Sequence, residues 1–475
     1  MALLSRLRAR VGARVARTRI GAALVVHPVD GISDEAGALA GALPADPHHD
    51  LVVMDLPAVS PIEVWQAFAG VLPRGRGPVR VVPGRAGSDI PPYAWQWLAD
   101  RSNRPVTAPY GVALHLAGAV FVPGEGAWVD FGKETAPRWA GKRFPAPAWE
   151  SVELGRTRTV GLRGVAEPLP AGVWLRPDVA PDALAPARDR LTMTLPRLRD
   201  TPIVALGARD AVDLTVAEVA AFWRTLPADA AAAVRFTRYG ALSPADDAAF
   251  GQELANAVGA EVCVYTGVPV AGDVLALRQD GSLGARVFAQ AYAYRPGGLP
   301  VGRLAAHRAP APGLSEVAAG VYWYAPDVVV EVVRAGLWVR PAEQTGDPAG
   351  VRAAPLDPMH TLLVHESSDP ARAERLRDAA VGVMNLLDES TLPQSRLIAS
   401  TVLAGTHRRV LAAKPAPEPA VPELQALHQQ ALHQPAPEQH AADDETDLPW
   451  LSRLMETVSI PFPAAASEEA VHGLR

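Results

Sequence analysis

ALVVHPVDGISDEAGALAGALPADPHHDLVVMDL, residues 23–56, is the stretch that decides the fold. Two short, almost continuously apolar runs, 23–28 and 51–56, enclose a segment with helical spacing at 33–43. Strands that are buried on both faces of a parallel sheet read as unbroken apolar runs, and a helix usually connects them. The stretch therefore predicts a strand–helix–strand unit of an α/β protein.

The same alternation continues toward the C-terminus. Apolar runs at 79–84 and 105–109 predict two more strands, and the segments 61–72 and 91–102 predict helices between them. GAVFVP and GAWVDF, which are joined by the glycine-rich PGEG, predict an antiparallel hairpin after the last of these strands. Together these patterns predict a small doubly wound α/β module with an antiparallel hairpin extension.

Ordered sequence matches indicate that this module is duplicated. PIEV at 61–64 matches VAEV at 216–219, and LADRSNRPVTAPYG at 98–111 matches LANAVGAEVCVYTG at 254–267. The offset between the members of each pair is about 155 residues. Matches that follow one another in order at nearly constant spacing favour an internal repeat.

A third match extends the pattern. GVWLRP at 172–177 and GLWVRP at 336–341 are interpreted as the ends of the two modules. LLVHESSDPARAERLRDAAVGVM at 362–384 resembles LVVHPVDGISDEAGALAGAL at 24–43, with a strand, a histidine, an acidic turn and a helix. This match predicts a shorter third α/β piece that ends in a strand at 396–400.

The predicted fold class is α/β, with two tandem doubly wound modules, a shorter third piece and a C-terminal tail. The tail is predicted to be disordered, because its composition is dominated by Pro, Ala, Gln and His. The predicted segments are an amphipathic helix at 1–20, α/β modules at 21–178 and 179–345, a strand–helix–strand piece at 346–409, a disordered linker at 410–446 and a docking segment at 447–475.

Composition excludes several classes of protein. The 475 residues carry 45 Lys+Arg, 51 Asp+Glu and one cysteine, for a formal net charge of -6. One cysteine excludes an internal disulfide and a structural zinc site of several thiolates, and no apolar run approaches the ~18 residues of a membrane span. We expect no nucleic acid, metal or cofactor, no secretory signal peptide, and a cytoplasmic location in a GC-rich bacterium.

The N-terminal arm is basic and amphipathic. Residues 1–29 carry six arginines and no acid. On a helix this arm would have an apolar stripe with arginines on both sides. The stripe contains Leu4, Leu7, Val11 and Val15, and the flanking arginines are Arg6, Arg10 and Arg14. Such a helix either contacts an anionic membrane or a partner's groove, or packs on its own domain. The first alternative would make the protein peripheral to a membrane.

A second amphipathic segment, DLPWLSRLMETVSIPF, begins at Asp447 behind the proline-rich linker. Asp447 can cap a short helix that has Pro449 in its first turn. The apolar stripe of that helix is Trp450, Leu451, Leu454, Met455 and Val458. We expect this stripe to dock on a partner protein, because a tether of about 35 residues suits a distant contact. The alternative is that it packs on its own modules.

Candidate catalytic residues follow the predicted strands. The sequence has no Gly-x-Ser-x-Gly, Walker, His-Glu-x-x-His or strand-linked Gly-x-Gly-x-x-Gly motif. Open α/β sheets bind ligands beyond the carboxyl ends of their strands. The polar residues there are His27, Asp55, Ser88 and Asp89. They could form a hydrolytic set, or they could simply cap helices, and the second module has no counterpart to them.

Two other features are weaker candidates for a functional site. Cys263 lies in the apolar run EVCVY of a predicted strand, so we expect it to be buried and inert. His48, His49 and Asp50 precede a strand as a predicted solvated loop, which would need a further ligand to hold a metal.

One family resemblance rests on YAWQWLADRSNRPVTAPYG, followed by FVPGEGAWVDF and KRFPAPAWESV. These runs resemble modules of large actinobacterial proteins of the polymorphic-toxin type, which look like caspase-like or clostripain-like α/β peptidase domains. The resemblance covers about 50–150, and more faintly 202–290. Where such an enzyme needs its cysteine, this chain has VVPG at 81–84 and RFTRYG at 235–240. The resemblance therefore implies catalytically dead relatives used for binding.

Two hypotheses for function follow. The first is a non-enzymatic interaction or scaffold protein, and the second is a hydrolase that uses His27, Asp55 and Ser88-Asp89. Hydrogen-bond distances among those side chains separate the two hypotheses, because a hydrolase needs its catalytic groups within reach of one another.

Overall fold

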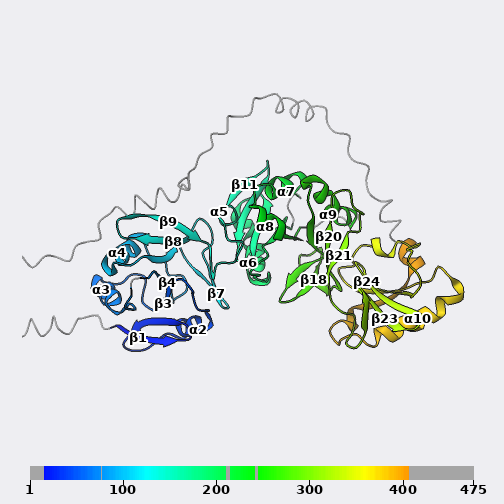
Figure 1. Cartoon of the computed structure of the whole chain (residues 1–475), viewed down its shortest axis with the longest axis horizontal. Coiled ribbons are helices and arrows are strands. Elements are labelled where there is room, and N and C mark those ends of the chain that lie inside the picture. The colour runs from blue at the N-terminus through cyan, green and yellow to red at the C-terminus, as the bar shows by residue number, and fades with distance from the viewer. Residues whose placement is uncertain (1–14, 76, 210–213, 241–243, 406–475) are drawn as a thin grey trace, which may run out of the picture.

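The protein is described here by a computed structural model that covers residues 15–75, 77–209, 214–240 and 244–405. Figure 1 shows three α/β units that follow one another along the chain, each with its own main sheet. The predicted α/β fold, with two doubly wound modules and a shorter third piece, is confirmed. The predicted tail, the docking segment and most of the basic arm lie outside the described residues.

Module 1 is built on a seven-stranded mixed sheet. Its strands, in the order of the sheet, are β1 (Val15–Ile20), β2 (Ala23–Pro28), β3 (Asp50–Met54), β4 (Val79–Pro83), β5 (Val106–Tyr110), β8 (Ala127–Gly132) and β9 (Thr135–Gly141). The strands β2 to β5 are parallel, and the outer pairs are antiparallel. A small separate sheet contains β6 (Leu114–Leu116), β7 (Ala119–Phe121) and β10 (Arg143–Phe144).

Helices cover both faces of this sheet, as the apolar strands predict. They are α2 (Asp34–Ala42), α3 (Ile62–Val71) and α4 (Pro92–Ser102). Val53 and Val82 pack in one cluster with α2, whereas Val52 and Val81 pack in another with α3 and α4. Successive strand residues point to opposite faces of the sheet. Adjacent valines of one strand therefore pack against the helices on both faces.

Module 2 repeats the plan on an eight-stranded sheet. In the order of the sheet, its strands are β11 (Arg158–Val160), β12 (Gly164–Leu169), β13 (Gly172–Pro177), β14 (Ile203–Leu206), β15 (Arg235–Arg238), β16 (Val262–Tyr265), β20 (Ala289–Tyr294) and β21 (Arg303–His307). Three short strands form a side sheet: β17 (Val268–Val270), β18 (Asp273–Leu277) and β19 (Leu283–Arg286). The helical segments around this module are α5 (Val152–Gly155), η1 (Pro181–Leu184), α6 (Ala185–Thr194), α7 (Val216–Trp223), α8 (Ala228–Ala233) and α9 (Pro244–Val258).

Module 3 has a six-stranded sheet and is shorter. Its strands, again in the order of the sheet, are β22 (Ser315–Ala318), β23 (Val321–Ala325), β24 (Val328–Val333), β25 (Gly336–Pro341), β26 (Thr361–His365) and β27 (Ser395–Ala399). Its helical segments are η2 (Val351–Ala353), α10 (Pro370–Met384) and η3 (Leu392–Gln394), and residues 400–405 are also helical. The predicted cap of α10 is confirmed, because Asp369 accepts a hydrogen bond from the backbone N–H of Ala371.

The parallel part of each of the three modules opens on the same hairpin. In β1–β2, β12–β13 and β24–β25 two six-residue strands pair in one register, which ends at Pro28, Pro177 and Pro341 respectively. A strand parallel to each hairpin follows, namely β3, β14 or β26, and then a second one, namely β4, β15 or β27. One structural unit therefore occurs three times within the described chain.

This register corrects the interpretation of GVWLRP and GLWVRP. These runs are β13 and β25, and they belong to the opening hairpins of modules 2 and 3 because they pair in parallel with the next strand. The sheets therefore divide the chain before 158 and before 315, and not at 178 and 345. For the same reason β26 corresponds to β3, whereas the match with residues 24–43 had placed it one strand too early.

Two local predictions are also wrong. Residues 15–20, which were expected in the basic helix, form β1, because Gly21 and Ala22 turn the chain so that β1 pairs with β2. Val15 lies half-buried against the core of module 1. GAVFVP and GAWVDF do not form a hairpin, since β7 pairs with β6 and β10 while β8 pairs with β5 and β9.

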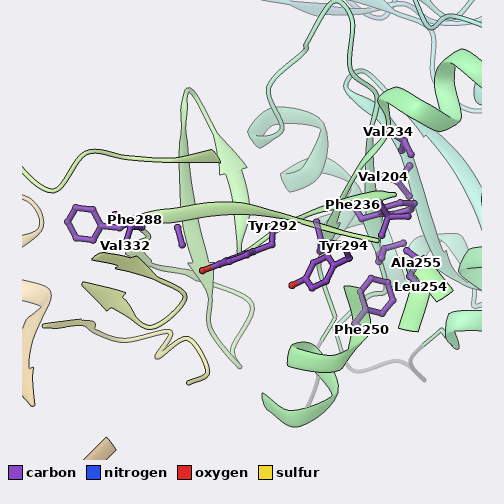
Figure 2. Close-up of a cluster of buried hydrophobic side chains, with 14 of the residues drawn as sticks. Val204, Val234, Phe236, Phe250, Leu254, Ala255, Phe288, Tyr292, Tyr294 and Val332 are labelled. Carbon is purple, nitrogen blue, oxygen red and sulfur yellow. The ribbon is translucent and has the colours of Figure 1, made fainter. Parts of the chain in front are cut away.

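Modules 2 and 3 share one cluster of buried hydrophobic side chains. Figure 2 shows part of it: Phe236 of β15, Phe250 of α9, Tyr292 and Tyr294 of β20, and Val332 of β24. Because the cluster includes residues of both sheets, a loss of packing in module 3 should also lower the stability of module 2. Within the described residues, no helix is both long enough and apolar enough to cross a bilayer.

Candidate functional site

His27, the first residue of the predicted hydrolytic set, is buried at the end of β2. Its Nε2 lies 3.0 Å from Thr18 Oγ1, and its Nδ1 lies 2.7 Å from the carbonyl oxygen of Pro28. Both contacts stay within the opening hairpin. The imidazole therefore fastens β1 to β2.

Asp55 is fully buried and serves the start of α2. Its carboxylate accepts hydrogen bonds from Ser33 N at 2.7 Å, from Ser33 Oγ at 2.9 Å and from Arg85 Nε at 2.8 Å. Burial opposes ionisation, but these donors outweigh it and lower the pKa of Asp55. Asp55 is thus a permanent carboxylate that orients the capping residue of α2.

The predicted hydrolytic set does not form. Ser88 is half-buried, Asp89 is exposed, and no hydrogen bond within the described residues joins either of them to His27 or Asp55. The strand-end positions were correct, but His27 bonds within the β1–β2 hairpin, and Asp55 bonds to Ser33 and Arg85. His27, Asp55, Ser88 and Asp89 lie near one edge of the sheet without a shared reacting centre.

The repeat explains His27. Arg176 and Arg340 occupy its position in modules 2 and 3, and each bonds to the carbonyl of the next proline as His27 does. Thr18 is likewise replaced by an acid in both of those modules. The resulting ion triads are Glu167 with Arg176 and Arg188, and Glu331 with Arg340 and Arg352. His27 is therefore the module 1 version of a structural hairpin clasp.

A groove of about 1100 Å³ lies at the opposite ends of the strands in module 1. It runs along β9, which is an edge strand of the sheet within the described chain, and its floor reaches β5 and β8. Phe131, Trp139 and Val152 supply apolar lining. Lys133 and Arg138 are exposed beside them and have no ion-pair partner among the described residues. This groove is the candidate functional site.

A chain of hydrogen bonds and one close His–Asp contact forms one wall of the groove. Asp46 Oδ2 lies 3.0 Å from His49 Nδ1 and accepts from Arg80 Nε at 2.7 Å. His49 Nε2 lies 3.1 Å from Thr107 Oγ1, which donates to Asp130 Oδ1 at 2.6 Å. Burial opposes ionisation of Asp46, but the bonds from His49 and Arg80 outweigh it and lower its pKa. The loop before β3 is thereby fixed to β5 and β8, and the predicted solvated loop is wrong for His49.

Asp46, His49 and Thr107 follow one another as the acid, the base and the hydroxyl nucleophile of a catalytic triad would. The hydroxyl proton of Thr107, however, is not directed at His49. The single hydroxyl proton of Thr107 goes to Asp130, which can only accept it. His49 must then donate through Nε2 instead of receiving that proton, as a general base would. Thr107 is also only 1% exposed. The network is a rigid wall of the groove.

Cys263 occupies in module 2 the register position of Thr107, opposite Arg235 as Thr107 lies opposite Arg80. It is half-buried, and burial raises the pKa of its thiol. Cys263 is thus less buried than expected. A protonated thiol is a poor nucleophile, and the inertness of Cys263 stays a prediction. Among the described residues, no group of three or more histidine, cysteine, aspartate or glutamate side chains could hold a metal ion.

Lys142 is buried where the turn between β7 and β8 meets β10. Its Nζ donates to the carbonyl oxygens of Gly124, at 2.6 Å, and of Gly126. Burial lowers the pKa of Lys142 to about 8. The ammonium form donates to these two carbonyl oxygens below that pH, and the neutral amine still has two N–H groups for them above it.

Lys142 predicts a stabilisation of module 1 at alkaline pH. The unfolded lysine titrates near 10.5 and the folded one near 8, so the unfolded state binds more protons between these values. The free energy of unfolding should therefore rise by about 3 kcal/mol from this group between pH 8 and pH 10.5. Urea unfolding across this range measures it, and Lys142→Met should remove the rise. An equal slope in both proteins would contradict the assignment.

Comparisons with models of protein families, with curated proteins and with solved structures find no match. The resemblance to degenerate peptidase modules thus stays a prediction.

The groove residues His49, Thr107, Asp130, Lys133 and Arg138 were not predicted as a site. They come from separate segments that meet only after β5 and β8 pair in antiparallel fashion. The sequence signal for this region is the hairpin that is predicted after the last parallel strand. That prediction pairs GAVFVP with GAWVDF, which do not pair in the structure.

Proposed function

We propose that the chain is a non-enzymatic scaffold protein that binds partner proteins through repeated α/β modules without catalytic function. The observation that carries this proposal is the groove of about 1100 Å³ beside the edge strand β9. Its polar wall is held by internal hydrogen bonds. Its rim presents Lys133 and Arg138, two exposed cations without an ion-pair partner in the described part of the chain, next to aromatic side chains. These features suit binding of a chain segment.

The partner that suits the groove is an extended acidic segment of another protein. Four basic residues line it, His49, Arg104, Lys133 and Arg138, against the single acid Asp130. Asp130 already accepts the hydroxyl proton of Thr107, and Arg104 is bonded to Asp50. Lys133 and Arg138 are therefore available for carboxylates, while Trp139 can contact an apolar residue between them. The outer edge of β9 adds backbone donors and acceptors for an extended chain.

The two amphipathic segments extend this proposal. The stripe of Trp450 and Leu454 behind the linker supplies a second contact with a protein partner. The basic arm that precedes β1 supplies contact with an anionic membrane surface or a partner. The protein is then a cytoplasmic, membrane-peripheral scaffold of a GC-rich bacterium.

Charge reversal in the groove tests the proposal. Lys133→Glu with Arg138→Glu should abolish capture of acidic partners by the immobilised full-length chain, because two attractive rim charges become repulsive. The matched control is Arg199→Glu with Arg377→Glu, which changes the net charge equally at exposed positions outside the groove. Captured proteins are identified by mass spectrometry. If both double variants lose the same proteins, or neither loses any, the groove is not the binding surface.

A further inference from the structure

A small pocket lies in module 3, where the connections that follow β25 and β26 separate. The chain after β25 leads to η2, and Val351 of η2 packs with Val364 on one face of the sheet. The chain after β26 leads to α10, and Leu376 of α10 packs with Leu363 on the other face. Connections that leave in opposite directions open a crevice beyond the carboxyl ends of the strands, where α/β proteins bind ligands. The pocket at this place has a volume of about 240 Å³.

Glu366, the residue after β26, lines this pocket and is only 3% exposed. Its Oε1 accepts hydrogen bonds of 2.6–2.9 Å from the N–H of Ser367, the N–H and hydroxyl of Ser368 and the hydroxyl of Ser400. Among the described residues, its Oε2 accepts only from Gln344 Nε2, at 3.4 Å. Burial opposes ionisation of Glu366, but the serine bonds outweigh it and lower its pKa. Glu366 is therefore a buried carboxylate whose second oxygen can accept further hydrogen bonds.

Within the described residues, no cation forms an ion pair with Glu366. Arg340 of β25 donates to Glu331 and to two backbone carbonyl oxygens instead. Arg372 lines the pocket but bonds to Glu343 at the exposed rim. A buried charge is costly unless an opposite charge compensates it. A cation from outside the described residues would balance Glu366.

Module 1 shows how the repeated unit balances the same carboxylate. Asp55 is the counterpart of Glu366, because its N–H donates to Val26 O as the N–H of Glu366 donates to Val339 O. Asp55 is paired with Arg85, whose Nε lies 2.8 Å from Oδ1. The carboxylate at this position thus has its own arginine in module 1.

The counterpart of that arginine is missing from module 3. Pro83 ends β4 and Ala399 ends β27, and the two residues pair with equivalent positions of β3 and β26. Arg85 and Thr401 each follow two residues later. Thr401 is exposed and uncharged, so module 3 keeps the buried carboxylate without the arginine that balances it in module 1.

We infer that this pocket binds an alkylammonium group, which supplies the positive charge that Glu366 lacks. An ammonium group has three N–H donors and no acceptor, which suits the accepting Oε2. Pro341, Pro348 and Leu376 provide apolar walls for its alkyl chain. A cavity of about 150 Å³ holds a molecule as large as benzene, so this pocket admits a short alkyl chain. The inference does not depend on the groove of module 1.

A metal ion suits the pocket less well. Among the described residues, no group of three or more histidine, cysteine, aspartate or glutamate side chains could hold one. Hard metal ions need several oxygen ligands, whereas an ammonium group needs one anionic partner and a few acceptors.

Titration of the full-length chain with n-butylammonium, followed by ligand-observed NMR, tests the inference. Glu366→Gln should raise the Kd at least tenfold, because the amide keeps the volume of the carboxylate but removes its charge. The matched control is Glu374→Gln, which makes the same change at an exposed position of α10 outside the pocket. Its Kd should stay within about twofold of the wild type.

Thr401→Arg keeps the test valid if Glu366→Gln fails to fold. It restores the arginine of module 1 at an exposed position, so it should also raise the Kd for n-butylammonium at least tenfold. Val402→Arg adds the same charge at the next residue, which is 57% exposed, and should bind as the wild type does. A wild type that binds no n-butylammonium, or an unchanged Kd in both Glu366→Gln and Thr401→Arg, would overturn the inference.

Two further probes identify the source of the group. N-acetyl-lysine N-methylamide that binds more tightly than n-butylammonium would assign the pocket to a lysine side chain of a partner protein. Equal or weaker binding would assign it to a free amine, and either result supports the ammonium chemistry. Butyrate has the opposite charge on a chain of the same length and should not bind. Binding of butyrate in place of n-butylammonium would overturn the inference.

Discussion

Glu331→Gln should lower the free energy of unfolding by about 3–5 kcal/mol, because it leaves two arginines without their shared carboxylate in a largely buried site. Glu331 accepts from Arg340 Nε at 2.6 Å and from Arg352 Nε at 2.5 Å. Both guanidinium groups also lie over the ring of Trp338, which is fully buried. The amide keeps the volume of the carboxylate but removes its charge.

The same site should make module 3 sensitive to acid. Burial opposes ionisation of Glu331, but the bonds from Arg352 and Arg340 outweigh it and lower its pKa. The stabilisation is therefore complete above the pKa of the unfolded glutamate and is lost as the pH falls through the lower, folded value. Glu331→Gln should flatten this acid limb.

The control for Glu331 is Asp327→Asn, which breaks the exposed ion pair with Arg375 in the same module. Exposed pairs contribute little, so its unfolding midpoint should stay near that of the wild type. Denaturant unfolding followed by circular dichroism provides the comparison. Equal effects of the two substitutions would show that the triad is not a structural clasp.

Gly336→Ala is the second substitution with a large expected effect, at least about 3 kcal/mol. Gly336 opens β25 with φ +144°, and an added Cβ would lie 2.2 Å from the carbonyl oxygen of Leu362 on β26. Gly172 has the same constraint in module 2, where the Cβ would meet Ile203 O at 2.1 Å. In both cases the obstacle is backbone, which cannot move without breaking the parallel pair.

Module 1 has Ala23 at this position, and its parallel pairing starts one residue later, at Leu24 with Val52. The matched control is Gly346→Ala, because a Cβ there meets nothing within 4 Å. Its stability should remain within about 0.5 kcal/mol of the wild type. If Gly336→Ala is tolerated equally well, the close approach of β25 and β26 is incorrect. Thermal unfolding of both variants provides the measurement.

The parallel strands and their helices could be predicted from the sequence, because a buried strand and an amphipathic helix leave local patterns. The run at 23–28 and the run at 51–56 appear as β2 and β3 within two residues. The boundaries between modules could not be predicted in the same way. The run GVWLRP has the same apolar pattern whether it ends one sheet or begins the next. Only its pairing with β14 shows that it belongs to module 2.

The hairpin clasp has a sequence signal in the spacing of its charged residues. Glu167 precedes Arg176 by nine residues, and Glu331 precedes Arg340 by the same distance. Thr18 and His27 keep this spacing with uncharged or weakly basic groups. Considered alone, His27 at a strand end suggested catalysis, whereas its counterparts in the repeat indicate a structural role.

The groove depends on contacts that no local pattern encodes. Thr107 and Asp130 face each other only because β5 and β8 pair in antiparallel fashion, and His49 reaches them from the loop before β3. The exposed cations of the rim, Lys133 and Arg138, appear in the sequence as ordinary surface residues.

Hydrogen exchange of the full-length chain with and without a captured partner tests the central claim most directly. If the groove of module 1 is the binding surface, the partner should slow exchange in residues 130–141, which include β9 and the end of β8. The strands β12 to β15 in module 2 should exchange at unchanged rates. Slowed exchange elsewhere in the chain, with none in residues 130–141, would contradict the account.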